Sequence, residues 1–123
     1  MVYRVGVSQA RSGEYDGPMA NQYMYVFGPA DRPLREDPSA WTSQDERTAS
    51  EHYLRLRQAT IDGTVILAGR PLGDEGPAVV IFDAESEDDA RRFMEADPFV
   101  AEGLFTAELY PFSAALVRGE VTG

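Results

Sequence analysis

The fold of this chain is decided by residues 63–82, GTVILAGRPLGDEGPAVVIF, which hold two apolar runs on either side of a turn-rich connection. Residues 63–68 and 78–82 are rich in β-branched and aromatic side chains, so each run predicts a strand. The connection at residues 69–77 contains three glycines and two prolines. Two strands joined by so short a connection are expected to pair as an antiparallel hairpin.

A first helix is predicted before the hairpin, from about Thr42-Ser43 to Ile61. Ser43 and Glu46 have the spacing of a capping box, and Asp62-Gly63 closes the helix. Residues that recur at helical spacing predict the face that packs on the sheet. This apolar stripe comprises Ala49, Tyr53, Leu56 and Thr60.

A second helix is predicted after the hairpin. Ser86 is its N-cap, and acidic residues follow in the first turn, where the helix dipole favours them. The helix must end before Pro98, because the position before a proline disfavours helical geometry. Residues 98–103 predict one further helical turn. One face of the second helix comprises Ala90, Phe93, Met94 and Asp97.

The first and last strands of the chain are predicted at residues 22–27, ended by Gly28-Pro29, and at residues 106–112. The order βαββαβ is typical of a ferredoxin-like α+β fold, a four-stranded antiparallel sheet with two helices on one face. Residues 79–82 are apolar without alternation, so both faces of the sheet need a cover. A partner sheet is the simplest cover for the second face, and we expect a homodimer.

A chain of 123 residues is expected to form one domain. We place this domain at residues 22–118, followed by a tail at residues 119–123. Residues 1–21 form an N-terminal extension, for which an added edge strand, a flexible arm and an upstream extension all stay open. Residues 28–42 carry three prolines and predict a loop that could cover part of the domain.

The composition excludes several classes of function. A net charge of −10 would repel phosphate backbones and anionic membrane surfaces, so neither nucleic acid nor a membrane is an expected partner. The first residues are too short an apolar run for a membrane span, and the lack of cysteine permits a reducing compartment, so we expect a cytoplasmic protein. A single histidine without cysteine argues against a structural zinc site.

The candidate catalytic residues are His52 and Asp97. His52 is the only histidine and lies at the rim of the apolar stripe, where a partly buried imidazole suits acid–base chemistry. The alternative is a histidine packed at the edge of the core. Asp97 lies on an apolar face, at the helix end where a carboxylate opposes the dipole. Its alternative role is to cap the helical turn that begins at Pro98, and capping is compatible with catalysis.

Four further residues are candidates for binding a small-molecule substrate. Arg70 carries a guanidinium that can hold a carboxylate through two hydrogen bonds, and Gly69 allows a ligand to approach closely. The alternatives are a surface ion pair for Arg70 and a bulge at Gly69. Tyr25 and Phe99 suit the wall of an aromatic pocket, although aromatic residues at such positions also form the core.

Six short motifs share an order and spacing that resemble one known family. They are His52-Tyr53-Leu54, Leu67-Ala68-Gly69-Arg70, Ala90-Arg91, Ala96-Asp97-Pro98-Phe99, Gly103-Leu104-Phe105 and Tyr110-Pro111-Phe112. Through them, residues 22–116 resemble the YCII-related (YciI-like) domain family. The resemblance implies a ferredoxin-like domain that pairs into a dimeric α+β barrel, and an enzyme with a histidine and an aspartate in a cleft. His52 and Asp97 match those two positions, whereas residues 1–21 and 28–42 depart from the shorter members.

Two classes of function fit these residues. In the first, the protein is a small enzyme without a cofactor, in which His52 shuttles a proton and Asp97 orients the imidazole during isomerisation, elimination or lactone chemistry. In the second, it is a non-catalytic ligand-binding or assembly module. Some dimeric α+β barrels bind haem, so haem on His52 is a further alternative, although a lone histidine on a helix is thin evidence for it.

Overall fold

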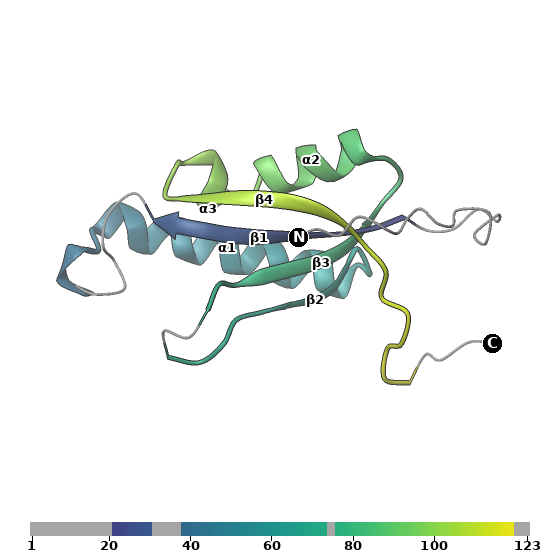
Figure 1. Cartoon of the computed structure of the whole chain (residues 1–123). Helices are drawn as coiled ribbons and strands as arrows, with labels where there is room; N and C mark the ends of the chain where they lie inside the picture. The colour runs from purple at the N-terminus through teal and green to yellow at the C-terminus, as the bar shows by residue number, and fades with distance from the viewer. Residues whose placement is uncertain (1–20, 31–37, 74–75, 120–123) are drawn as a thin grey trace.

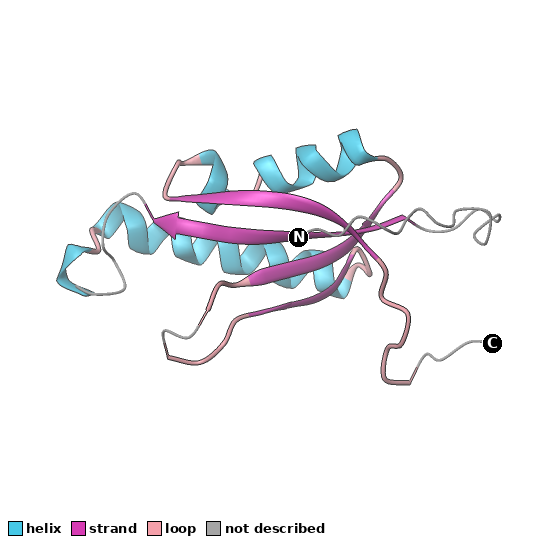
Figure 2. Ribbon diagram, viewed as in Figure 1, coloured by secondary structure: helices cyan, strands magenta, loops and turns pink. Residues whose placement is uncertain are grey.

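The computed structural model describes residues 21–30, 38–73 and 76–119 (Figure 1). Its four antiparallel strands lie in the order β2-β3-β1-β4. The strands are β1 (Asn21–Ala30), β2 (Val65–Gly69), β3 (Val79–Ala84) and β4 (Phe105–Phe112). The helices are α1 (Ser43–Ile61), α2 (Glu87–Glu95) and α3 (Pro98–Ala101), and a 3-10 turn, η2 (Pro38–Ala40), precedes α1. The predicted ferredoxin-like α+β fold and its hairpin, β2 with β3, are confirmed (Figure 2).

The core lies between one face of the sheet and the helices. Alternate residues of β1 point into it, as the two-residue period of a strand requires. The buried cluster comprises Tyr23, Tyr25, Phe27, Val65, Val80 and Phe82 from the strands and Leu56, Ala90 and Met94 from the helices. Because residues of α1 and α2 join the same cluster, both helices cover the same face of the sheet.

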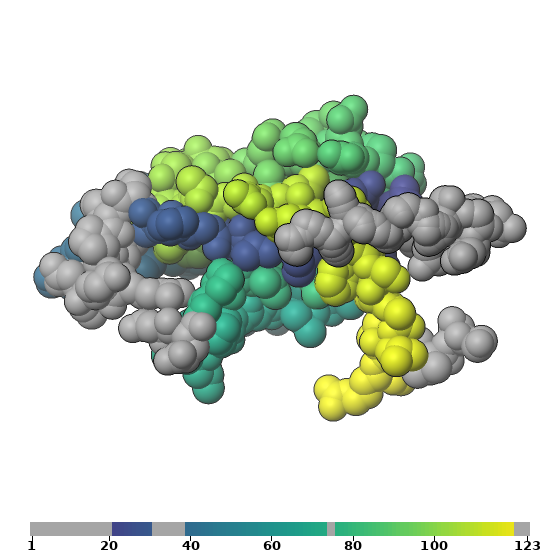
Figure 3. All heavy atoms as spheres, viewed as in Figure 1, coloured from purple at the N-terminus to yellow at the C-terminus, as the bar shows by residue number. Residues whose placement is uncertain are grey.

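The opposite face of the sheet is covered by no helix within the described residues. Met24 and Val26 of β1 lie opposite Ile81 and Val79 of β3, and all four side chains are half-buried. Figure 3 shows atoms of β1 and β4 at the molecular surface. The unbroken apolar run of β3 therefore divides between the two faces, with alternate residues in the core and alternate residues on the uncovered side.

Helix α1 begins with a capping box one residue earlier than predicted. The hydroxyl of Thr42 accepts a hydrogen bond from the amide of Asp45 at 3.0 Å, and the Asp45 carboxylate accepts one from the amide of Thr42 at 2.9 Å. The prediction of Ser43 and Glu46 was wrong, because the extended N-cap conformation falls on Thr42 and Ser43 is already helical. The predicted end at Ile61 is confirmed, and Gly63 follows with a φ of 92°.

The packed face of α1 also differs from the predicted stripe. Tyr53 is 63% exposed and Thr60 is exposed, whereas Thr48 and Leu56 are buried and His52 is half-buried. The prediction relied mainly on apolar side chains and so omitted Thr48, a polar residue that is 2% exposed. The true face is rotated so that His52 lies along it between Thr48 and Leu56, rather than at its rim.

Strand β1 continues past the predicted end at Gly28-Pro29 and reaches Ala30. Two features allow a proline here. The pairing of β1 with β3 reaches only Val26, so Pro29 lacks a neighbour on that side, and the register with β4 shifts after Phe27. Of the predicted loop at residues 28–42, residues 31–37 lie outside the described residues, as do residues 1–20 and 120–123 of the predicted extension and tail.

Replacing Thr42 by alanine is expected to lower the free energy of unfolding by about 1 kcal/mol, because the amide of Asp45 loses its acceptor. Ser43→Ala is the matched control, and it should change stability by less than about 0.5 kcal/mol. Urea denaturation of the two variants measures the difference. A larger loss for Ser43→Ala would favour a capping box at Ser43 and Glu46 instead.

Candidate functional site

The site is built around the carboxylate of Asp97, which is fully buried. Asp97 lies in the short link between α2 and α3, with Pro98 as the first residue of α3. One carboxylate oxygen, Oδ1, accepts a hydrogen bond from the backbone amide of Phe99 at 3.0 Å. Asp97 is therefore the N-cap of α3, and this fixes the position of its side chain.

Two side chains from other elements also form hydrogen bonds with this carboxylate. Nδ1 of His52, on α1, lies 2.8 Å from Oδ1 of Asp97. The hydroxyl of Tyr25, on β1, donates to Oδ2 at 2.6 Å in a buried hydrogen bond. The site thus joins the central strand, the long helix and the link between the two shorter helices at a single buried group.

Aromatic rings hold the imidazole of His52 in place. Phe99 stacks on it with ring centroids 4.0 Å apart and an interplanar angle of 24°. Phe27 approaches it edge-on at 5.6 Å. An ionised carboxylate can only accept, so with a neutral imidazole the hydrogen lies on Nδ1 and Nε2 is left with a free lone pair. This tautomer makes Nε2 a base on the side of the ring away from Asp97.

The surroundings favour the ionised form of Asp97. Burial alone would raise the pKa of its carboxyl, but the hydrogen bonds from His52 and Tyr25, the charge of His52 and the amide of Phe99 together hold that pKa below its ordinary value. The pKa of the Tyr25 hydroxyl is raised, first by burial and then by the adjacent Asp97 carboxylate. Tyr25 therefore stays a neutral donor beside a charged acceptor.

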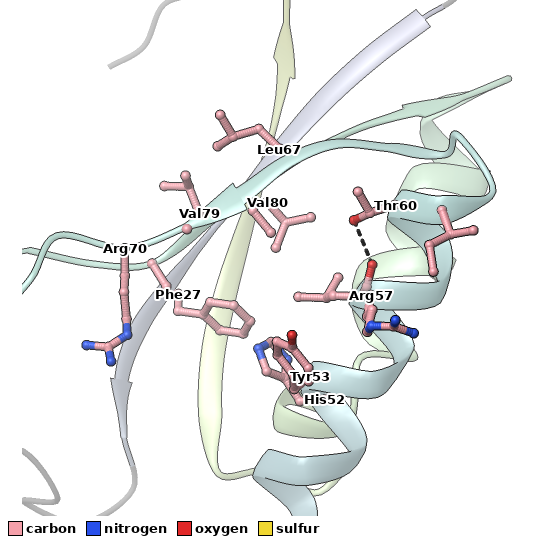
Figure 4. A pocket seen from close by; sticks show the side chains of 14 residues that line it. Phe27, His52, Tyr53, Arg57, Thr60, Leu67, Arg70, Val79 and Val80 are labelled. Atoms are coloured by element: carbon pink, nitrogen blue, oxygen red, sulfur yellow. Dashed lines mark hydrogen bonds between the residues drawn. The ribbon is translucent and has the colours of Figure 1, made fainter.

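A groove of about 710 Å³ runs between α1 and the β2–β3 hairpin and reaches His52. In Figure 4, Phe27 points across it toward His52 and Tyr53, and Arg70 extends from the end of β2 beside Phe27. Its walls include Leu56, Ala68 and Val80. The groove therefore joins apolar walls to one imidazole and to arginine side chains.

The structure brings together most of the residues that the sequence singled out. His52, Gly69 and Arg70 line the groove, and Phe99 lies against the imidazole. Arg70 is exposed, and no ion pair joins it to another described residue, so the predicted alternative of a surface pair finds no partner there. Tyr25 is not in the groove wall: it is fully buried and contacts Asp97 instead.

Sequence reasoning missed two residues of the site, Phe27 and Arg55. The alternation of Tyr25 and Phe27 along one strand could have indicated that both rings face the same helix as His52. Arg55 lies three residues after His52 on α1, a spacing that places both on one side of the helix. Its Nη2 donates to the carbonyl of Phe93 at 2.9 Å, and its guanidinium lies over the Phe93 ring.

Neither a metal centre nor a membrane span is found in residues 21–30, 38–73 and 76–119. No group of three or more His, Cys, Asp or Glu side chains in these ranges is placed to hold a metal ion. None of the helices there is both long and apolar enough to cross a bilayer.

The comparison with known proteins identifies one domain. The family described as the YCII-related domain matches residues 24–113, which run from β1 to just beyond β4 and include every residue of the site described above. A search of curated proteins found no match.

The free energy of unfolding is expected to fall at low pH because Asp97 becomes protonated there. Its pKa in the folded chain lies below the ordinary value of 3.8, so its stabilisation is complete above about pH 4 and is lost as the pH falls toward the folded value. Asp97→Asn should cost about 1–3 kcal/mol at pH 7, and the gap to the wild type should narrow toward pH 3.

Urea denaturation at pH 7, 5, 4 and 3 measures this difference in the free energy of unfolding. The contributions of the other acidic groups are the same in both proteins and cancel. Glu95→Gln, an exposed carboxylate at the end of α2, is the control and should change stability by less than about 0.5 kcal/mol at each pH. If the stability difference between Asp97→Asn and the wild type stays constant down to pH 3, the pKa of Asp97 in the folded chain does not set the acid dependence, which would contradict the prediction.

Proposed function

This chain belongs to the YCII-related domain family, and we propose that it is a small enzyme in which His52 and Asp97 move protons on a small metabolite. The observation that carries the proposal is the 2.8 Å contact between Nδ1 of His52 and Oδ1 of Asp97, with His52 lining the groove. A base oriented by a buried carboxylate is an arrangement that general acid–base catalysis uses.

In the proposed mechanism, Nε2 of His52 takes a proton from a carbon or oxygen atom of the substrate. The imidazolium that forms is stabilised by the adjacent carboxylate of Asp97, which stays ionised. In an isomerisation, the proton returns to a different atom of the substrate as a double bond shifts. In an elimination, the bond to the leaving group breaks and the leaving group takes the proton. In the opening of a lactone, His52 takes the proton from a water molecule that attacks the carbonyl carbon and returns it to the ring oxygen as the C–O bond breaks, and closing is the reverse. The proposed cycle needs no cofactor.

The groove supports a substrate with an apolar body and an acidic group. Leu56 and Val80 offer apolar contact near the imidazole, and Arg70 offers a guanidinium for a carboxylate. Gly69 leaves open space beside Arg70, because a Cβ added there would meet no atom within 4 Å. We propose small carboxylic acids with an activated C–H bond as the substrate class.

We also propose that residues 22–118 act as a homodimer. The uncovered face of the sheet presents Met24, Val26, Val79 and Ile81, and a second copy of this face would bury them. Dimers commonly form by the pairing of one surface with its own copy about a twofold axis.

Exchange of substrate hydrogen with solvent tests the enzymatic proposal. A panel of 2-oxo acids, 3-oxo acids and unsaturated lactones that carry a carboxyl group is followed by proton NMR in deuterated water. The wild type is expected to accelerate exchange for at least one compound, and His52→Gln should slow it by about 10²–10⁴-fold. Exchange within threefold of wild type in His52→Gln, or no exchange by the wild type across the panel, would favour the alternative of a non-catalytic ligand-binding module.

Light scattering after size exclusion tests the homodimer. The wild type at micromolar concentration should have the mass of two chains, and Ile81→Glu should shift it toward one chain, because a charge would be buried at the interface. Ser50→Glu, on the exposed side of α1, is the control and should leave the mass unchanged. A wild type with the mass of one chain would refute the proposed pairing.

A further inference from the structure

We propose that Tyr25 is a positioning residue, which keeps the Asp97 carboxylate ionised and oriented toward His52. The inference rests on the proposed function, because it names what keeps the His52–Asp97 pair in register. It concerns groups that do not touch the groove: the Tyr25 side chain is fully buried beneath it.

The position of the Tyr25 hydroxyl is determined by its ring, which the core holds tightly. Phe27, Phe82 and Phe93 contact that ring edge-on, with centroids 5.4, 5.7 and 6.4 Å from its own. The hydroxyl therefore stands at a fixed point even before it meets its acceptor. A donor placed in this way by packing costs little to order when the hydrogen bond forms.

The carboxylate of Asp97 depends on this donor because its two oxygens are satisfied from different sides. Oδ1 accepts hydrogen bonds from Nδ1 of His52 and from the amide of Phe99, whereas the one described residue that donates to Oδ2 is Tyr25. Without the hydroxyl, a buried carboxylate oxygen would lack a partner, which is costly. The group would then gain a proton or turn, and either change would remove the acceptor that orients His52.

Because the Tyr25 hydroxyl is a neutral donor, it leaves the negative charge of the Asp97 carboxylate in place beside the imidazole of His52. Arg55 brings a permanent cation to the same region, and its charge acts on the Tyr25 hydroxyl in the direction opposite to that of Asp97. Its Nη1 is buried, and no described residue forms a hydrogen bond with it. The hydroxyl of Tyr25 adds no charge of its own beside Asp97, so the carboxylate stays the charged partner of the His52 imidazolium.

Tyr25→Phe removes the hydroxyl and keeps the ring. The 15N NMR spectrum of the ligand-free protein is the first readout, because one histidine gives one set of imidazole signals. The wild type should show a strongly deshielded Nδ1–H proton, as expected for a hydrogen bond to a carboxylate. In Tyr25→Phe this signal should weaken and move toward its position in Asp97→Asn.

Tyr23→Phe is the matched control. Tyr23 lies two residues away on the same face of β1 and is also buried, but no hydrogen bond joins its hydroxyl to a described residue. Its variant should leave the Nδ1–H signal unchanged. An Nδ1–H signal in Tyr25→Phe that matches the wild type would overturn the inference.

Should Tyr25→Phe fail to fold, 3-fluorotyrosine placed at position 25 retains the hydroxyl and makes it a stronger donor. The Nδ1–H proton should then shift from its wild-type position, because a stronger donor to Oδ2 changes the charge that Asp97 presents to His52. No shift with this analogue would also overturn the inference.

The second readout is the rate of hydrogen exchange between solvent and a substrate that the panel identifies. Tyr25→Phe should lower kcat by about tenfold to a hundredfold and leave KM within about twofold, because Tyr25 lies outside the groove. A raised KM with unchanged kcat would overturn the positioning role. If the wild type exchanges no substrate while the NMR signal responds as expected, the proposed function fails and the positioning of Asp97 by Tyr25 stands.

Discussion

The structure depends on the cost of burying one carboxylate. Asp97 has no exposed surface, and an ion in such a place must find donors on every side. The chain supplies them from a strand, a helix and a backbone amide, so the positions of β1, α1 and α3 are tied to one another through this group. The helix cap that the link between α2 and α3 needs is thereby also the partner of the imidazole.

Stability alone does not call for such an arrangement. Replacing a buried ion pair by well-packed apolar residues is often neutral or stabilising. Phe99 and Phe27 already surround the imidazole with rings against which an apolar side chain would pack well. Packing alone therefore does not account for the His52–Asp97 pair among these rings.

The sequence was most informative where a local rule acts alone. Pro98 marks both the end of α2 and the start of α3, and the order of strands follows from runs of β-branched residues. Prediction failed where tertiary packing decides. The phase of α1 depends on Thr48, a polar residue in the core, and the extension of β1 to Ala30 depends on its pairing with β4. The role of Tyr25 could not be predicted from the sequence, because a buried tyrosine cannot be told from an ordinary core residue until its hydrogen-bond acceptor is known.

The distances along the chain that separate the site residues have a consequence for folding. Asp97 meets a partner 45 residues earlier in His52 and another 72 residues earlier in Tyr25. Each contact closes a long loop, whose entropy must be overcome before the contact forms. Partly folded chains that contain only the hairpin or a single helix therefore have no assembled site. The contacts of Asp97 with His52 and Tyr25 therefore form late and cooperatively, together with the closure of the domain.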